Sequence, residues 1–231
     1  MIKIIVTSFY NTLINSEEAI PMSTMLEIDR IRNKGILFTI STNGLYDEIL
    51  DYNKDFPFTD YIISLNGSYI YDVLNNKCIY KQKIAKLDVK KIYNSFKNYK
   101  INYYTENKVL NNYNETLNKD IYKIEIETKN TIKIENPNCN FFSIEKDNKK
   151  YLEIISNKCN SYKSLKEIIE KNSIKENEVL AIIGNESDFI ISKNIKETYI
   201  VKNANCKLIN IKKVTKSNND LGVEMILRKI K

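Results

Sequence analysis

Polar residues that could take part in chemistry stand shortly after three apolar runs of this sequence. In chain order they are Ser8 and Tyr10, Thr42, and Asp188. A serine hydroxyl is a weak nucleophile unless a neighbouring base takes its proton. The chain contains no histidine, which excludes an imidazole base and a histidine-ligated metal site. A tyrosinate at Tyr10 is the remaining candidate base for Ser8, and it is costly because the pKa of tyrosine is about 10.

The cysteines and the net charge point to no other kind of site. The four cysteines are scattered and form no CxxC pair, so neither a zinc site nor a disulfide framework is expected. They are Cys78, Cys139, Cys159 and Cys206. The net charge of +7 comes almost wholly from lysines interspersed with aspartate and glutamate. Nucleic-acid binding usually shows clustered Lys and Arg, so we interpret the lysines as a solvated surface and keep a basic nucleic-acid accessory only as a third, weaker hypothesis.

Length and composition limit the class of protein. The 231 residues amount to about one and a half average domains, which suggests one large domain or a core with a smaller insert. Apolar residues make up 42%, enough for a real core, and no run of 18 apolar residues could form a transmembrane helix. The apolar run at the start is too short for a secretory signal, so we expect a cytoplasmic protein without a membrane partner.

Alternating strands and helices must position the polar residues. Short apolar, β-branched runs predict buried strands, and the amphipathic stretches between them predict helices. The expected strands are 2–6, 36–41, 61–64, 179–183 and 199–201. The expected helices are 21–34, 45–53, 162–171, 188–192 and a last one over 223–230. This order implies parallel strand pairs with crossover helices, hence an open α/β sheet.

The middle of the chain has a different pattern. A hairpin across residues 75–76 precedes a predicted helix over 87–97 and several strand-like runs. These runs are 101–105, 121–127, 140–145 and 151–155. The run 121–127 alternates apolar and polar residues, which predicts a strand with its polar side chains facing outward. One helix with several antiparallel strands predicts an α+β insert, and we interpret the Asn-rich stretch 106–119 as a mobile loop.

The whole pattern resembles the haloacid dehalogenase (HAD) superfamily, and more narrowly its Cof-type, class IIB sugar-phosphate phosphatases. The segments that carry the resemblance are IIVTSFYNTLIN (4–15), GILFTISTNG (35–44), YIISLNGSYIYD (61–72), VLAIIGNESD (179–188) and VTKSNNDLGV (214–223). The resemblance implies an α/β, HAD-like Rossmannoid core with a parallel sheet over residues 1–82 and 157–231. It also implies a small α+β, type-IIB cap domain over 83–156, inserted after the third core strand.

The resemblance further implies where a site would lie. In the family, one aspartate attacks phosphorus, a second protonates the leaving oxygen, and a Thr or Ser and a Lys hold the phosphoryl oxygens. Here Ser8 stands at the nucleophile position and Tyr10 at the acid/base position. Thr42 matches the phosphate-binding hydroxyl, whereas the lysine position falls on Ser161.

The remaining family positions also depart from the pattern. Lys158 and Lys163 lie near the lysine position, and a small loop shift could bring an amine there. Gly184 stands at the chief metal-ligand position, or Asn185 if one gap is allowed, and neither supplies a carboxylate. Asp188 is left as a single, weak metal ligand. Mg²⁺ serves the family but wants several oxygen ligands, so we expect no cofactor here.

Several of these residues also have ordinary structural explanations. Thr42 could satisfy the backbone at the end of its strand, and Asp188 could cap the following helix, which is the role we favour for it. Lys158 and Lys163 could belong to the solvated surface. A group of tyrosines could line a ligand groove or pack the small sheet. They are Tyr93, Tyr99, Tyr103 and Tyr104.

We therefore expect a phosphatase homologue that has lost its nucleophile, acid/base and metal-ligand aspartates. Losing one acid/base group commonly costs about 10²–10⁴ in rate, and several such groups are missing here. The favoured hypothesis is an inactive pseudo-phosphatase with a binding or regulatory role toward a small phosphorylated ligand or a protein partner. The alternative is a hydrolase of small phosphate esters or sugar phosphates with relocated catalytic residues.

Overall fold

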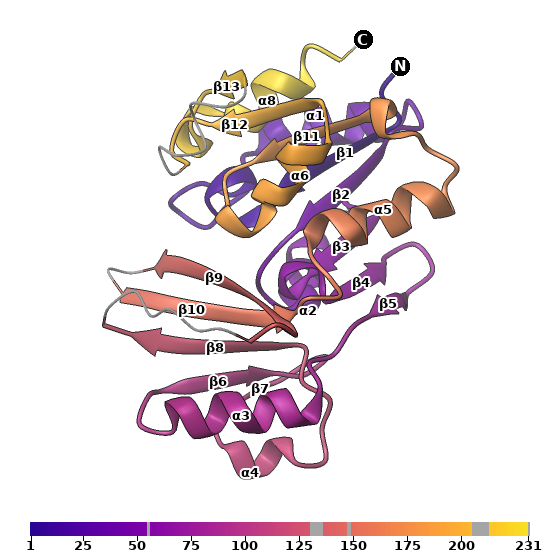
Figure 1. Ribbon diagram of the computed structural model, residues 1–231. Helices are drawn as coiled ribbons and strands as arrows, with labels where there is room; N and C mark the ends of the chain where they lie inside the picture. The colour runs from indigo at the N-terminus through magenta and orange to yellow at the C-terminus, as the bar shows by residue number, and fades with distance from the viewer. Residues whose placement is uncertain (55, 130–135, 147–148, 205–212, 231) are drawn as a thin grey trace.

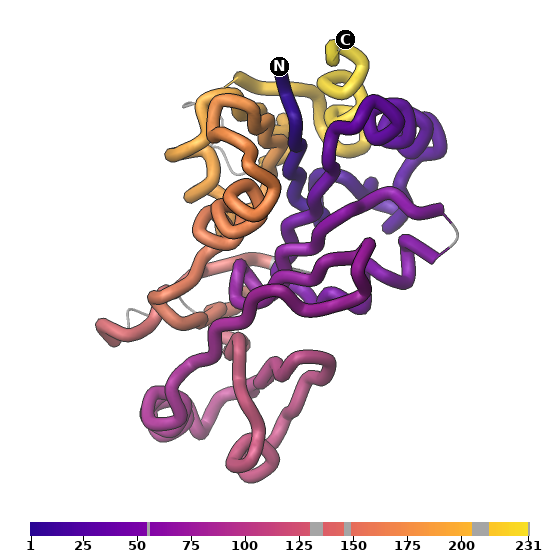
Figure 2. Tube along the Cα trace, turned by 90° about the vertical axis from the view of Figure 1, so that its right-hand side faces the viewer, coloured from indigo at the N-terminus to yellow at the C-terminus, as the bar shows by residue number. Residues whose placement is uncertain are grey.

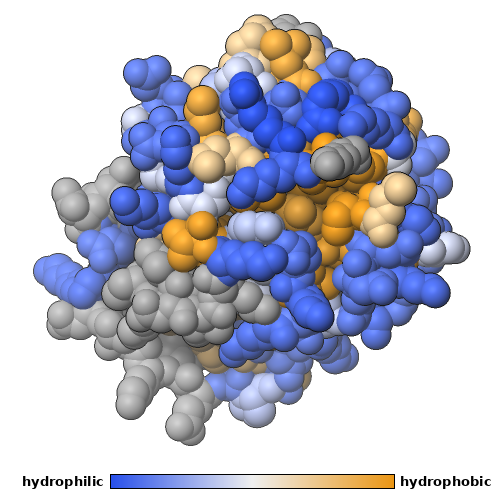
Figure 3. Space-filling view, turned by 90° about the horizontal axis from the view of Figure 1, so that it is seen from above, coloured by the Kyte–Doolittle hydropathy of each residue, from blue (hydrophilic) through white to orange (hydrophobic). Residues whose placement is uncertain are grey.

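The strands that the structure describes form two sheets that lie one above the other (Figure 1). The computed structural model describes residues 1–54, 56–129, 136–146, 149–204 and 213–230. Cys206 therefore lies outside the described residues. Both termini lie at the end of the larger sheet that is farther from the smaller sheet, as Figures 1 and 2 agree. Seen from that end, hydrophilic residues cover most of the face, with apolar groups gathered between them (Figure 3).

The larger sheet has eight strands in the order β13-β12-β11-β1-β2-β3-β4-β5. Its strands are β1 (Ile4–Ser8), β2 (Leu37–Ser41), β3 (Tyr61–Ser64), β4 (Tyr69–Asp72), β5 (Lys77–Lys81), β11 (Val179–Ile183), β12 (Glu197–Val201) and β13 (Lys213–Thr215). Pairs from β13 to β3 are parallel, and β4 and β5 add an antiparallel hairpin. The predicted α/β sheet is confirmed. The structure adds β13, which we did not predict. Lys213 and Val214 of this strand are exposed, so the sequence shows no apolar run there.

Helices cover both faces of the larger sheet because the central strands are buried on both sides. Along β1, Ile5 packs into one core and Ile4 and Val6 into the other, as strand alternation requires. The first core includes residues of α1 (Met22–Arg32), α2 (Tyr46–Asn53) and α8 (Gly222–Leu227). The second includes residues of α5 (Ser161–Lys171) and α6 (Phe189–Asn194). None of the helices that the structure describes has the length and apolar composition to cross a bilayer.

The smaller sheet is antiparallel and has five strands in the order β7-β6-β8-β10-β9. Its strands are β6 (Ile101–Tyr104), β7 (Val109–Leu110), β8 (Lys123–Thr128), β9 (Cys139–Lys146) and β10 (Lys149–Ser156). The helices α3 (Lys86–Phe96) and α4 (Tyr113–Thr116) lie on the side away from the larger sheet (Figure 1). The stretch 106–119 contains β7 and α4, so it is not a loop along its whole length as we expected.

The polar face of β8 also differs from the prediction. We expected the polar side chains of 121–127 to face outward, but Lys123 is only 1% exposed. Its ammonium reaches the backbone carbonyl of Asn43, which follows β2 of the larger sheet. The prediction failed because this face of the smaller sheet is turned toward the larger sheet. Alternation of polar and apolar residues alone does not show whether the polar side chains face solvent or the loops of another sheet.

Candidate functional site

The carboxylate of Asp188 lies at the centre of a closed hydrogen-bond network. Its Oδ2 accepts a hydrogen bond from Ser8 Oγ at 2.6 Å, and its Oδ1 accepts one from Ser41 Oγ at 2.6 Å. Ser8 and Ser41 end the neighbouring parallel strands β1 and β2 and are paired in register, so both hydroxyls reach the same carboxylate. All three residues are buried. The Ser8 hydroxyl is therefore already used as a hydrogen-bond donor to Asp188 in the protein interior.

Burial governs the charge state of Asp188. It raises the pKa of this carboxyl above its ordinary value of 3.8, and the hydroxyls of Ser41, Ser8 and Ser161 partly offset that rise. Ser161, at the first position of α5, is itself buried and donates to the carbonyl of Ser187 at 3.1 Å. The structure thus brings together three residues that the sequence singled out. It places Asp188 before α6, but its side chain makes no capping hydrogen bond, so the helix-cap interpretation was wrong.

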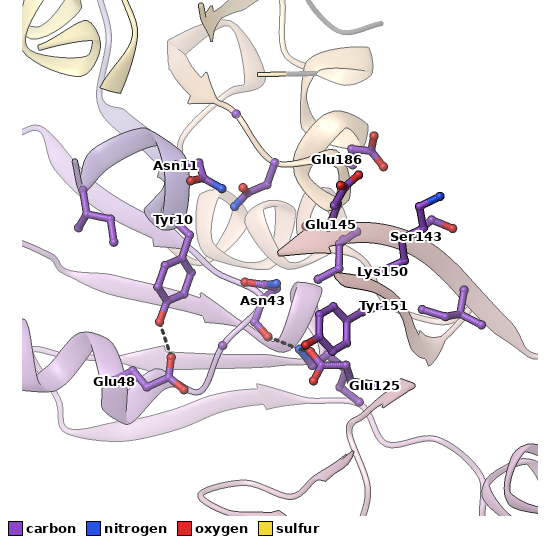
Figure 4. A pocket seen from close by; sticks show the side chains of 18 of the residues that line it. Tyr10, Asn11, Asn43, Glu48, Glu125, Ser143, Glu145, Lys150, Tyr151 and Glu186 are labelled. Atoms are coloured by element: carbon purple, nitrogen blue, oxygen red, sulfur yellow. Dashed lines mark hydrogen bonds and ion pairs between the residues drawn. The ribbon is translucent and has the colours of Figure 1, made fainter. Parts of the chain in front are cut away.

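A cavity of about 770 Å³ lies between the two sheets (Figure 4). From the larger sheet it is lined by loops that follow β1, β2 and β11, and from the smaller sheet by β6, β8, β9 and β10. Tyr10, Gly184 and Asn185 are the predicted positions that line it. Other predicted positions are not among its described lining residues; they are Ser8, Thr42, Lys158, Ser161, Lys163 and Asp188.

Tyr10 faces this cavity from the kinked turn Phe9–Leu13 that follows β1. Its hydroxyl donates to Glu48 Oε2 of α2 at 2.6 Å, and Figure 4 shows the two side chains pointing toward each other. Burial, then the hydrogen bond to Glu48 and the negative charge of Glu48, raise the pKa of Tyr10 well above its ordinary value of 10.0. A tyrosine held as a donor to a carboxylate is a poor base, which disfavours a tyrosinate mechanism.

The hydroxyl of Thr42 and the two lysines near position 161 have local partners. Thr42 is buried, and its Oγ1 accepts a hydrogen bond from the backbone N–H of Gly44 at 3.0 Å. Lys163 Nζ donates to the carbonyls of Asn157 and Lys158 at 3.2 and 3.1 Å. Both lysines are exposed. In this structure Thr42 satisfies the end of its strand, and Lys163 stabilises the loop before α5.

Gly184, which the resemblance assigns to the chief metal-ligand position if no gap is allowed, is tightly enclosed. A Cβ added there would lie 2.5 Å from Thr12 Oγ1 and 2.7 Å from Val201 Cγ2. A side chain at this position would therefore require its neighbours to shift. Within the described ranges, the structure contains no group of three or more His, Cys, Asp or Glu side chains suited to a metal ion.

A buried ion pair that the sequence did not reveal lies within the smaller sheet and is hydrogen-bonded to loops of the larger sheet. Lys123 Nζ of β8 donates to Glu153 Oε1 of β10 at 2.8 Å and to the carbonyl of Asn43 at 2.6 Å. Glu153 also accepts from Asn43 Nδ2 at 3.0 Å and from Asn66 Nδ2 at 2.8 Å. Both charged side chains are almost fully buried. A usable signal existed, because Glu153 interrupts the apolar run 152–155.

The fold and the sequence together place this chain in a known class. Residues 5–141 match the model of the haloacid dehalogenase-like hydrolase family, and the chain belongs to that family. This confirms the superfamily that the motif segments indicate.

Solved structures share the fold over almost the whole chain. A haloacid dehalogenase-like hydrolase from B. subtilis superposes with a TM-score of 0.90 at 16% identity, covering 100% of both chains. A HAD phosphatase from Bacteroides thetaiotaomicron, BT1666, gives 0.84 at 13% identity over 99% of this chain and 95% of its own. The HAD subclass IIB sugar phosphatase BT4131 gives 0.83 at 17% identity over 98% of both chains. The predicted class IIB architecture is therefore confirmed at the level of fold.

One relative is closer in sequence but over a shorter stretch. A protein from Buchnera aphidicola subsp. Baizongia pistaciae, which bears the provisional name of a phosphatase, is 34% identical over 92 residues. The match covers 40% of this chain and about a third, 34%, of that relative's length.

Proposed function

We propose that this HAD-like phosphatase homologue does not hydrolyse phosphate esters by the family mechanism and instead binds a small molecule or a protein partner. The observation that carries this proposal is the pair of hydrogen bonds from Ser8 and Ser41 to Asp188. These bonds hold Ser8, which the resemblance assigns to the nucleophile position, in a closed interior network, and Ser8 is not among the described residues that line the cavity.

The chemistry of Ser8 supports the absence of turnover. A hydroxyl buried against a carboxylate has no room for an incoming phosphoryl group, because Ser8 is 0% exposed. A phosphoserine formed there would be a stable ester, and Tyr10 is held as a donor to Glu48 rather than as a base for water. The carboxylate that a phosphatase of this family needs at the first position is absent.

The oxygen donors near Asp188 do not fit Mg²⁺. Both carboxylate oxygens of Asp188 already accept serine hydroxyls, and Gly184 supplies no side-chain oxygen. The backbone carbonyl of Tyr10 accepts a hydrogen bond from Thr12 Oγ1 at 3.3 Å. Mg²⁺ prefers near-octahedral oxygen coordination, so a single enclosed carboxylate is too little for it. We therefore also propose that the protein holds no catalytic metal ion at Asp188.

The smaller sheet has a natural role in this proposal as a cap. With α3 and α4 it corresponds to the insert expected over 83–156, and its strands β8 and β10 supply one wall of the cavity. In the proposed function this cap encloses a ligand instead of a reacting phosphate ester.

The alternative, a hydrolase with relocated catalytic groups, has one supporting observation. Glu48 and Tyr10 are hydrogen-bonded to each other in the cavity wall, where a substrate could meet them. Under this alternative Glu48 would be the relocated acid/base. It predicts turnover that depends on Glu48 and not on Ser8.

A steady-state assay of phosphate release distinguishes the two hypotheses. The wild type, Ser8→Ala and Glu48→Gln are compared on a panel of phosphate esters and sugar phosphates, with and without Mg²⁺. Ser95→Ala, an exposed serine on α3, serves as the matched control. We expect all four proteins to stay at background. Turnover in the wild type that disappears in Ser8→Ala or Glu48→Gln would contradict the proposal.

A further inference from the structure

We propose that the cavity between the two sheets binds a small organic cation, an amine that also carries hydroxyl groups, and not a phosphorylated ligand. This inference rests on the proposed function, in which the cavity is the binding site. Four features of the cavity wall carry it: the balance of charge, the state of Lys123, the aromatic rings, and an acceptor oxygen on Glu48.

The charge of the wall opposes an anion. The described residues that line the cavity include five glutamates and two lysines. They are Glu18, Glu48, Glu125, Glu145 and Glu186, with Lys123 and Lys150. A phosphate monoester carries a charge of about −1.5 to −2 at neutral pH, so it would meet an excess of like charge. An ammonium group would meet an attractive potential instead.

Lys123, the more deeply placed of the two lysines, does not offset this imbalance for a ligand. Its ammonium lies 2.8 Å from Glu153 Oε1 and 2.6 Å from the Asn43 carbonyl, and it is 1% exposed. Its charge is therefore already compensated by Glu153, and an incoming phosphate could reach it only by breaking a buried ion pair.

The same contacts show that this wall accommodates an ammonium group. Lys123 Nζ lies 4.0 Å from the ring centroid of Tyr104 and 3.9 Å from Glu125 Oε2. A carboxylate, a backbone carbonyl and an aromatic face together surround the cation, which is a favourable combination. Tyr10 and Tyr151 place further tyrosines in the same cavity.

Glu48 supplies an acceptor for a second cation. Its Oε2 accepts the Tyr10 hydroxyl at 2.6 Å, whereas its Oε1 has no hydrogen bond or ion pair with the described residues. Glu48 is partly exposed in the cavity wall. Burial and the charges of Glu125, Glu153 and Glu48 raise the pKa of Tyr104, which agrees with a negative potential on this side of the cavity.

The size and the polar groups of the cavity fit a small hydroxylated molecule. Its volume of about 770 Å³ falls in the usual range of about 300–1,000 Å³ for small-molecule sites. The side chains of Asn11, Asn43 and Asn185 add amide donors and acceptors around the acidic wall. A polyhydroxylated amine would use both sets of groups.

Three probes of matched shape test the charge preference. Glucosamine, glucose and glucose 6-phosphate share one ring and carry a positive charge, no charge and a negative charge at pH 6.5. Isothermal titration at low salt should give the affinity order glucosamine, glucose, glucose 6-phosphate. Glu48→Gln should weaken glucosamine binding about fivefold, the value of roughly one partly exposed ion pair, and should weaken glucose binding less. Glu167→Gln, an exposed residue of α5, is the matched control.

The inference is overturned if glucose 6-phosphate binds as tightly as glucosamine or more tightly. It is also overturned if glucosamine does not bind at millimolar concentration, or if Glu48→Gln does not change glucosamine binding. Failure of the proposed function gives a different result, because it appears as phosphate release in the turnover assay whatever the order of affinities.

Discussion

Ser8 Oγ lies 2.6 Å from Asp188 Oδ2 although 180 positions separate the two residues along the chain. The contact forms because β1 lies next to β11 in the sheet and both strands end at the same edge. The resemblance to the family assigns Ser8 to the nucleophile position and Asp188 to a metal-ligand position. Here they hydrogen-bond to each other, which turns a potential reaction centre into part of the protein interior.

Removing the Ser8 hydroxyl should reduce stability. Ser8→Ala takes away a donor to a buried carboxylate, and hydrogen bonds to charged groups contribute about 1.5–3 kcal/mol to the free energy of unfolding. Ser41→Ala should have a similar effect, since its hydroxyl makes the equivalent bond. Urea unfolding of both variants, with Ser95→Ala as an exposed control, measures the difference. A Ser8→Ala variant as stable as the control would show that the bond contributes nothing.

The pH dependence of stability should report the buried Asp188. Its pKa is raised in the folded protein, so the folded state binds this proton more tightly than the unfolded chain does. The stabilisation from this group is complete below its ordinary value of 3.8 and is lost as pH rises through the raised pKa. Asp188→Asn removes the titration.

Unfolding free energies of wild type and Asp188→Asn, measured in urea between about pH 4 and pH 7, test this expectation. The wild type should lose stability relative to the variant as pH rises. A difference that stays constant across the range, or that changes in the opposite direction, would contradict the raised pKa.

The ion pair between Lys123 and Glu153 should behave as a unit. Lys123→Met leaves Glu153 buried without its cation, which typically costs about 3–5 kcal/mol. Removing both charges in Lys123→Met/Glu153→Leu should restore much of that loss, because a buried pair replaced by apolar groups is often close to neutral. A double-mutant cycle from thermal or urea unfolding measures the coupling. Additive single effects would show that the two charges act independently.

Placing an aspartate at position 184 should not recreate the metal site. A Cβ there would lie within 2.7 Å of Thr12 Oγ1 and Val201 Cγ2, and such overpacking costs about 1–3 kcal/mol. Gly184→Ala carries the same Cβ without the carboxylate and serves as the control. Thermal unfolding with and without Mg²⁺ should show equal melting temperatures for Gly184→Asp. A rise in its melting temperature with Mg²⁺, absent from Gly184→Ala, would show that a metal site can form.

The sequence predicted the core strands well because fully buried strands leave continuous apolar runs. The expected runs 61–64 and 179–183 coincide with β3 and β11, which are buried along their whole length. The surroundings of Lys123 could not be predicted this way, since they depend on which loops of the larger sheet pack against β8. The role of Asp188 was also missed, because its partners lie on strands that are close only in the folded chain.

The ion pair also determines what it takes to part the two sheets. Lys123 and Glu153 both belong to the smaller sheet, on the neighbouring strands β8 and β10, so they would move together. Parting the sheets would instead separate these two side chains from Asn43 and Asn66, and water could replace the lost hydrogen bonds. The charged pair would travel intact, so a hinge-like opening that admits a ligand need not isolate a charge in the interior.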